Sequence, residues 1–164
     1  MRILFVCTAN ECRSPIGERL ARMLGVDASS AGVRAVVGRP MVPHAAEALI
    51  ELGGDAGEFS SRRVTPQIVA DADLILTMNT RHRDGVLLVA PSALRRTFTL
   101  SETVRLIEER HAETVRDLAA ARPFSLAKPG EDILDPMGHP YAEFQTAAKR
   151  ILDLTKIVVD HIRD

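Results

Sequence analysis

The 164-residue chain has no tryptophan, one tyrosine and only two cysteines. Two cysteines without clustered histidines cannot form the usual four-ligand zinc site, so we predict neither a metal nor another cofactor. The five histidines have no metal-like spacing, and we expect them on the surface or behind a site: His44, His82, His111, His139 and His161.

Long apolar runs and an excess of charge of one sign are also missing. No stretch approaches the roughly 18 apolar residues of a membrane span, and the first apolar run is too short for a signal peptide. The 21 basic and 22 acidic side chains leave a net charge of -1, which predicts no nucleic-acid or membrane partner. We therefore expect a cytoplasmic protein in a reducing compartment, where cysteines serve chemistry more often than structure.

What is present is the composition of one globular domain, with 46% hydrophobic and 26% charged residues, which we assign to residues 1–164. Short apolar runs alternate with segments of helical periodicity. Strands are predicted at 2–6, 27–31, 73–78 and 96–100, and helices at 15–24, 43–52, 66–70, from 80 onward, 101–122 and from 141 onward. We expect Thr65 to cap the helix at 66–70 and Asn79 or Thr80 to cap the next one.

Ser101 is expected to cap the helix at 101–122, which we interpret as long, charged and mostly solvated. Residues 32–43 and 123–140 are interpreted as loops. The alternation of strands and helices predicts an α/β fold with a parallel sheet and helices on both faces. Ligands of such sheets bind beyond the carboxyl ends of the strands, and Cys7 lies at one such end.

The loop from Cys7 to Ser14 has the features of an anion site. A loop between a strand and a helix N-terminus turns successive backbone N–H groups inward, and the helix adds its positive end. Arg13 follows Cys7 by six positions, so a curled loop returns its planar guanidinium toward the sulfur, where it can hold two phosphate oxygens. The same positive field favours the thiolate of Cys7, and Ser14 can donate a hydrogen bond to it. This pattern predicts a nucleophile that forms a phosphocysteine.

A phosphate ester also needs an acid to protonate its leaving group. Asp135, followed by Pro136, lies in the proline-rich loop before the last helix, and Glu131 and Asp132 are close to it in sequence. Spacing alone does not choose among these three carboxyl groups.

In four blocks the chain resembles the low-molecular-weight protein tyrosine phosphatase family, and these blocks follow the family order. They are residues 6–15 (Val-Cys-Thr-Ala-Asn-Glu-Cys-Arg-Ser-Pro), 30–32 (Ser-Ala-Gly), 73–78 (Asp-Leu-Ile-Leu-Thr-Met) and 135–136 (Asp-Pro). The resemblance implies a four-stranded parallel sheet flanked by helices and a hydrolase that acts on phosphotyrosine in proteins.

The resemblance also implies roles for single residues. It selects Asp135 as the general acid beside the catalytic Cys7 and Arg13, and makes Asn10, Ser14 and Ser30 supports of the loop. Cys12 becomes a possible disulfide partner of Cys7, or simply a small residue behind the loop. The implied phosphate-binding residues are Thr8, Ala9, Asn10, Glu11, Cys12, Arg13 and Ser14.

The chain departs from the family pattern at several positions. Ala9 stands where glycine is usual, and Glu11 stands where a hydrophobic residue is usual, or threonine in the branch that acts on phosphoarginine. Glu11 therefore leaves phosphotyrosine and phosphoarginine both open. The aliphatic loop 33–38 resembles that of bacterial members that serve exopolysaccharide tyrosine kinases, which implies an autophosphorylated kinase as a partner. The segment 101–130 is longer than expected for the family.

Two other classes of function fit the sequence less well. An arsenate reductase shares this loop but relays oxidation through further cysteines, and none follows Cys12. A non-catalytic anion-binding module would be expected to lack Cys7, Arg13 or the acid, and all are present. Val36 and Val37 are expected to be exposed for substrate docking or self-association, and we expect a monomer or a weak dimer.

Overall fold

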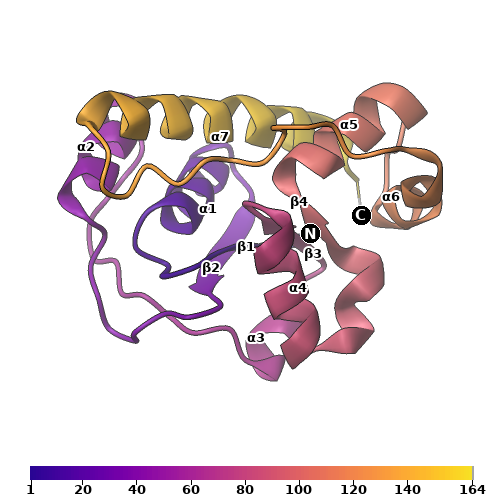
Figure 1. Ribbon diagram of the computed structural model, residues 1–164, viewed down its shortest axis with the longest axis horizontal. Coiled ribbons are helices and arrows are strands. Elements are labelled where there is room, and N and C mark those ends of the chain that lie inside the picture. The colour runs from indigo at the N-terminus through magenta and orange to yellow at the C-terminus, as the bar shows by residue number, and fades with distance from the viewer. Residues whose placement is uncertain (164) are drawn as a thin grey trace.

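The computed structural model describes residues 1–163 and contains a four-stranded, all-parallel sheet in the order β2-β1-β3-β4 (Figure 1). Its strands are β1 (Arg2–Cys7), β2 (Asp27–Gly32), β3 (Leu74–Thr77) and β4 (Thr97–Thr99). The register pairs Cys7 with Gly32 and Val6 with Thr77, so the ends of the three strands β1, β2 and β3 meet at one edge. The predicted α/β class with a four-stranded parallel sheet is confirmed.

Seven α-helices and two short 3-10 helices connect and cover the strands within residues 1–163. They are α1 (Arg13–Met23), α2 (Pro43–Glu51), α3 (Pro66–Ala70), α4 (Thr80–Val89), η1 (Pro91–Arg96), α5 (Leu100–Arg110), α6 (Val115–Ala121), η2 (Arg122–Phe124) and α7 (Tyr141–His161). Thr65 caps α3 and Asn79 caps α4 through their side chains, as expected.

The alternation of side chains along β1 explains why helices lie on both faces. Ile3, Phe5 and Cys7 point into a core shared with α1, α5 and α7. Leu4 and Val6 point to the other face, into a core shared with α3, α4 and η1. Successive residues of a strand face opposite sides, so a strand that is apolar on both sides must be covered on both.

Gly17 brings α1 close to the sheet. A Cβ at this position would lie 2.5 Å from Cδ1 of Phe5, so a larger residue would push the helix away from β1. Because α1 begins directly after the loop that follows Cys7, this close packing also fixes where the positive end of the helix lies.

The single helix predicted at 101–122 is wrong. Helix α5 starts earlier, because Thr99 and not Ser101 caps it in a reciprocal pair of hydrogen bonds with Glu102. It ends at Arg110, where His111 takes a left-handed conformation with φ 54°, and Thr114 and Asp117 form a second capping box that starts α6. Charged residues suit a continuous helix, but two capping boxes in sequence define two helices.

The expectation that this segment is mostly solvated is also wrong for α5, whose first eight residues, from Leu100 to Ile107, are buried. Part of the segment therefore belongs to the core. Within residues 1–163, none of the helices has an apolar stretch of the length that a membrane span requires.

Candidate active site

The loop between β1 and α1 lies at the carboxyl edge of the sheet, and neighbouring backbone holds its carbonyl groups outward. The carbonyl oxygen of Cys7 accepts from the N–H of Val33 at 3.0 Å, and that of Thr8 accepts from Arg34 at 2.9 Å. Farther along, Glu11 O accepts from the N–H of residue 42 at 2.9 Å. These bonds leave the opposite, N–H side of the loop free to face inward.

The backbone N–H groups of residues 9–12 have no acceptor within residues 1–163. Arg13 is the first residue of α1, and its N–H is one of those that a helix leaves unpaired. A row of unpaired N–H groups at a helix N-terminus is an anion-binding arrangement. The loop is therefore built to receive a negatively charged group.

Asn10 braces the curled loop. It is fully buried and has a left-handed backbone with φ 58°. Its side-chain N–H groups donate to the hydroxyls of Ser14 and Ser30, both at 2.9 Å, and its Oδ1 accepts from the N–H of Arg62 at 2.8 Å. The structure thus brings together the three residues expected to support the loop: Asn10, Ser14 and Ser30.

Gly32 allows β2 to approach this loop closely. A Cβ on Gly32 would lie 2.5 Å from the carbonyl oxygen of Thr8 and 2.8 Å from the nitrogen of Asn10. Glycine is required here by space. Ala9 needs no glycine, because the non-glycine residues with positive φ in residues 1–163 are Asn10, Glu58 and His111.

The sulfur of Cys7 lies 3.0 Å from the hydroxyl of Ser14. The Ser14 oxygen accepts from Asn10, and its single hydrogen has two acceptors in reach, the Cys7 sulfur at 3.0 Å and the carbonyl oxygen of Ala31 at 3.3 Å. The nearer of these contacts places the hydroxyl where it can donate to a thiolate. Cys12 has a different environment. Burial, followed by the charge on Cys7, raises the pKa of the Cys12 thiol to about 12. Of the two loop cysteines, Cys12 is therefore held as a thiol.

Arg13 connects this loop to the proline-rich loop before α7. Its guanidinium is buried, donates to the carbonyl oxygen of Ile133 at 2.9 Å and pairs with Asp135 at 3.2 Å. The Asp135 side chain is 49% exposed, so it stands at the mouth of the site and not behind it. The position of Ile133 is fixed in turn, because its N–H donates to the carbonyl oxygen of Met78 at the end of β3 at 2.9 Å.

The two other candidate acids, Glu131 and Asp132, have different surroundings. Glu131 is paired with Arg105 of α5 at 3.0 Å, with 15% of its side chain exposed. Asp132 lines a small cavity of about 140 Å³ that Asp135 and residues of α7 such as Arg150 also line. Of the three, Asp135 is the carboxyl group in contact with Arg13.

Sequence reasoning did not single out His82. Its Nε2 lies 2.8 Å from the Thr8 hydroxyl, directly behind the loop, and the ring is buried. Burial, followed by the charge of Arg13, lowers the pKa of His82 to about 4, so the ring is neutral at pH 7. The sequence does contain a signal for its position. Asn79 follows β3 and caps α4 by accepting from the N–H of His82, which places His82 at the carboxyl edge of the sheet.

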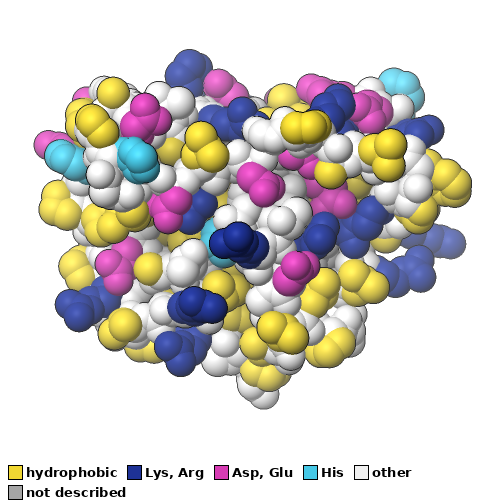
Figure 2. Space-filling model, in the orientation of Figure 1, with side chains coloured by type: hydrophobic (Ala, Val, Ile, Leu, Met, Phe, Trp, Pro, Cys, Tyr) yellow, Lys and Arg dark blue, Asp and Glu magenta, His cyan; other side chains and the backbone are white. Residues whose placement is uncertain are grey.

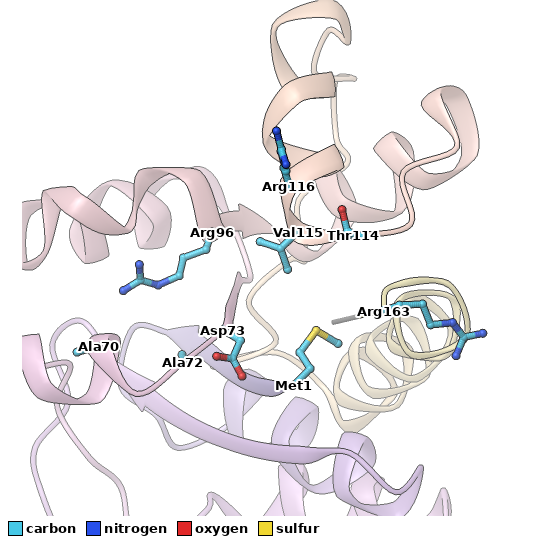
Figure 3. A pocket seen from close by; sticks show the side chains of 9 residues that line it. All are labelled: Met1, Ala70, Ala72, Asp73, Arg96, Thr114, Val115, Arg116 and Arg163. Carbon is cyan, nitrogen blue, oxygen red and sulfur yellow. The ribbon is translucent and has the colours of Figure 1, made fainter.

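A much larger cavity lies at the opposite edge of the sheet (Figure 3). It has a volume of about 720 Å³ and is lined by residues that precede the strands, among them Met1, Asp73 and Arg96. It contains neither cysteine, and the side chains of Arg116 and Arg163 point away from it in Figure 3. The predicted site residues Cys7, Arg13 and Asp135 lie at the carboxyl edge and do not line this cavity.

Comparison with known proteins gives a consistent result. Residues 2–158 match the family model described as low molecular weight phosphotyrosine protein phosphatase. The low molecular weight protein-tyrosine-phosphatase Etp of Escherichia coli (strain K12) is 38% identical over 102 residues, which cover 61% of this chain and 69% of that protein. A protein-arginine-phosphatase of Geobacillus stearothermophilus is 39% identical over 106 residues, covering 63% and 71%.

Solved structures agree with this. The YwlE arginine phosphatase from Geobacillus stearothermophilus superimposes with a TM-score of 0.78 at 30% identity, covering 97% of this chain and 90% of that one. The Erwinia amylovora tyrosine phosphatase AmsI has the same fold, with a TM-score of 0.80 at 24% identity and coverage of 99% and 93%. The chain belongs to the low molecular weight phosphotyrosine protein phosphatase family.

Proposed function

We propose that this protein is a protein-tyrosine phosphatase that hydrolyses phosphotyrosine through a phosphocysteine intermediate. The observation that carries the proposal is the meeting of three groups at one strand end. Cys7 lies against Ser14, Arg13 begins the helix behind an unpaired row of N–H groups, and Asp135 contacts Arg13. These are the nucleophile, the anion site and the acid that the reaction needs.

In the first step the thiolate of Cys7 attacks phosphorus. The sulfur–phosphorus bond forms and the bond from phosphorus to the phenolic oxygen breaks. Arg13 and the N–H groups of residues 8–14 hold the other phosphate oxygens while charge shifts onto them. The carboxyl group of Asp135 gives its proton to the departing oxygen, which leaves as a neutral phenol.

In the second step a water molecule attacks the phosphocysteine. The carboxylate of Asp135 takes a proton from this water, the sulfur–phosphorus bond breaks, and Cys7 returns as a thiolate stabilised by Ser14. Inorganic phosphate leaves. The same carboxyl group therefore acts as acid and then as base, and no cofactor enters the reaction.

Apolar side chains near this loop suit the ring of phosphotyrosine. Val36 and Val37 are 57% and 70% exposed and follow the residues that bond to the loop, while Leu134 and Met137 flank Asp135 and are 79% and 47% exposed. Exposed apolar groups beside a phosphate site favour an aromatic ester over a small polar one. Figure 2 shows basic, acidic and apolar side chains intermingled on one face, with no field of a single sign.

The second candidate substrate is phosphoarginine. The specific observation in its favour is that protein-arginine-phosphatases are among the relatives, at 39% and 37% identity. Glu11 adds to this, because a carboxylate in the loop repels a dianion but attracts the guanidinium that carries the phosphoryl group of phosphoarginine.

The proposed activity also suggests a partner and a form of regulation. We propose a phosphorylated protein as substrate, with an autophosphorylated bacterial tyrosine kinase as the specific candidate, in the cytoplasm and with the enzyme a monomer or weak dimer. Cys12 lies in the same loop as Cys7, and both are free thiols, which supports Cys12 as a disulfide partner that protects Cys7 from over-oxidation.

The test measures phosphate release by the purified protein from p-nitrophenyl phosphate, a phosphotyrosine peptide and a phosphoarginine peptide, with arsenate plus a thiol reductant as a further arm. We expect turnover of the phosphotyrosine peptide that Cys7→Ser abolishes. Asp135→Ala should lower turnover about tenfold or more while orthovanadate still binds. Preferred turnover of the phosphoarginine peptide would establish the second candidate, and arsenate reduction without phosphate release would refute both.

A further inference from the structure

The segment that carries Asp135 has no regular secondary structure between η2 and α7 within the described residues. Figure 1 shows it in orange, running along α7 from the region of α6 toward α2. The position of Asp135 therefore depends on how side chains fasten this segment to the rest of the fold.

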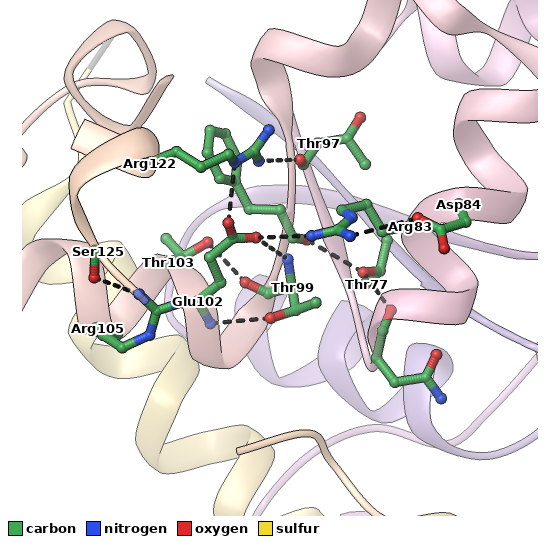
Figure 4. A network of polar contacts seen from close by, with 12 residues as sticks. Thr77, Arg83, Asp84, Thr97, Thr99, Glu102, Thr103, Arg105, Arg122 and Ser125 are labelled. Carbon is green, nitrogen blue, oxygen red and sulfur yellow. Dashed lines mark hydrogen bonds and ion pairs between the residues drawn. The ribbon is translucent and has the colours of Figure 1, made fainter. Parts of the chain in front are cut away.

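A buried ion pair fastens it at Glu131. Arg105 of α5 donates from Nε to Oε2 of Glu131 at 3.0 Å and from Nη2 to Oε1 at 3.3 Å, which is a bidentate contact. Only 6% of the Arg105 side chain is exposed. Its remaining terminal nitrogen donates to the hydroxyl of Ser125, at the start of the same segment (Figure 4). One guanidinium thus holds the segment at two points.

The backbone of Glu131 is held as well. Its carbonyl oxygen accepts from the hydroxyl of Ser101 on α5 at 2.5 Å and from the guanidinium of Arg150 on α7 at 2.7 Å. From Glu131 the chain runs through Ile133, which bonds to Arg13, to Asp135. Only three residues therefore lie between the anchored Glu131 and the proposed acid.

We propose that Arg105 and Glu131 are positioning residues for Asp135, and this rests on the proposed function. The pair sets the path of the loop, so that the carboxyl group of Asp135 stands over the anion site where the leaving oxygen must lie. This gives the extended segment 101–130 a role, because α5 supplies the guanidinium. A displaced acid weakens proton transfer, whereas the phosphate still meets Cys7, Arg13 and the loop amides.

Two physical properties of the ion pair explain why its loss should displace Asp135. A planar guanidinium that donates twice to one carboxylate fixes both distance and orientation, which a lysine ammonium does not. Truncating one member of a buried pair leaves the other charge uncompensated, so the loop must move to hydrate it. The movement is transmitted along a short stretch whose next fixed point is Ile133.

The test uses aryl phosphates whose phenols differ in acidity, from p-nitrophenyl phosphate to phenyl phosphate. A weakly acidic phenol needs protonation as it leaves, and a strongly acidic one needs it much less. For Arg105→Met and for Glu131→Gln we expect kcat/KM with phenyl phosphate to fall about tenfold or more, with a much smaller fall for p-nitrophenyl phosphate. We compare kcat/KM because it covers only the steps up to departure of the phenol, whereas kcat also includes hydrolysis of the phosphocysteine, which is the same for both substrates. The inhibition constant for orthovanadate should stay unchanged. Arg105→Lys should give an intermediate loss.

A matched control is a second ion pair of α5, between Arg122 and Glu102. Arg122, the first residue of η2, donates to Glu102 at 3.0 Å and bonds to the carbonyl oxygens of Leu94 and Thr97. It also stacks on Phe98, so its contacts are with β4 and its surroundings and not with Glu131 (Figure 4). Arg122→Met should lower the unfolding midpoint without changing the ratio of the two kcat/KM values. Unfolding midpoints of all variants show which of them are folded at the assay temperature.

Equal losses for both substrates, or no loss, in a folded Arg105 or Glu131 variant would overturn the proposal. If Arg105→Met does not fold, the proposal is tested by Glu131→Gln, which keeps the shape of the side chain. The quantity compared is again the ratio of the values for phenyl phosphate and p-nitrophenyl phosphate. Asp135→Ala separates this proposal from the proposed function. If Asp135→Ala itself shows no dependence on the leaving group, the acid assignment fails, and with it the basis for positioning.

Discussion

Replacing Asn10 tests how the phosphate loop is held in shape. In Asn10→Ala, three hydrogen bonds are lost, and the Ser14 hydroxyl, the Ser30 hydroxyl and the N–H of Arg62 lose a partner. At about 1 kcal/mol for each bond, and about 1 kcal/mol for alanine in the left-handed conformation, the free energy of unfolding should fall by about 4 kcal/mol. Asn10→Gly keeps the backbone conformation without strain, so its free energy of unfolding should fall by about 3 kcal/mol.

The measurement is equilibrium unfolding in urea of the wild type and the two variants, with kcat for p-nitrophenyl phosphate on the same samples. Both variants should also lose kcat, because a relaxed loop no longer aims its N–H groups at one point. An Asn10→Ala variant within about 1 kcal/mol of the wild type would refute the bracing role. Equal stabilities of the alanine and glycine variants would refute the strain assigned to φ 58° at Asn10.

Three further predictions concern residues around the loop. Glu11→Thr removes a carboxylate near the bound dianion and should lower KM for p-nitrophenyl phosphate about fivefold, for a screened repulsion of about 1 kcal/mol; an unchanged KM would mean that the carboxylate points away. Because the pKa of His82 is lowered from 6.5 to about 4, the unfolded chain takes up a proton that the folded protein refuses, so stability falls as the pH drops from 6.5 to 4. That loss should reach about 3 kcal/mol, and urea unfolding of His82→Gln should show a flatter pH profile. Since burial raises the pKa of Cys12 to about 12, iodoacetamide at pH 8 should label Cys12 only after unfolding, whereas Cys7 should be labelled in the folded protein and protected by phosphate.

The sheet could be predicted from sequence because its signals are local. An apolar run that ends at Cys7 is buried on both sides, and a polar loop followed by Pro15 marks the start of a helix. The caps Thr65 and Asn79 were predictable for the same reason, since a capping side chain bonds to backbone within three residues.

The segment 101–122 shows where local signals were misinterpreted. Ser101 is a plausible cap by type, but Thr99 has the glutamate three residues later that completes the box. The break at His111 has no proline or glycine to mark it. The second box, Thr114 with Asp117, has the spacing of a capping box in the sequence, but the charged residues around it favour one continuous helix.

Long-range pairing could not be predicted from the sequence. Spacing left Glu131, Asp132 and Asp135 equivalent, and the resemblance to a family selected Asp135. The structure separates them because Arg105, far back in the chain, pairs with Glu131, while Arg13 contacts Asp135. Which carboxylate meets which guanidinium is decided by how α1, α5 and the loop pack, and not by neighbours in sequence.

The central claim is that the sulfur of Cys7 carries the phosphoryl group between the two steps. The direct measurement is mass spectrometry of the protein after rapid acid quenching during turnover of p-nitrophenyl phosphate. We predict a phosphoryl group on the peptide that contains Cys7, and its loss from that peptide in Cys7→Ala. Rapid turnover with no phosphorylated peptide, or with the phosphoryl group on another residue, would contradict the account.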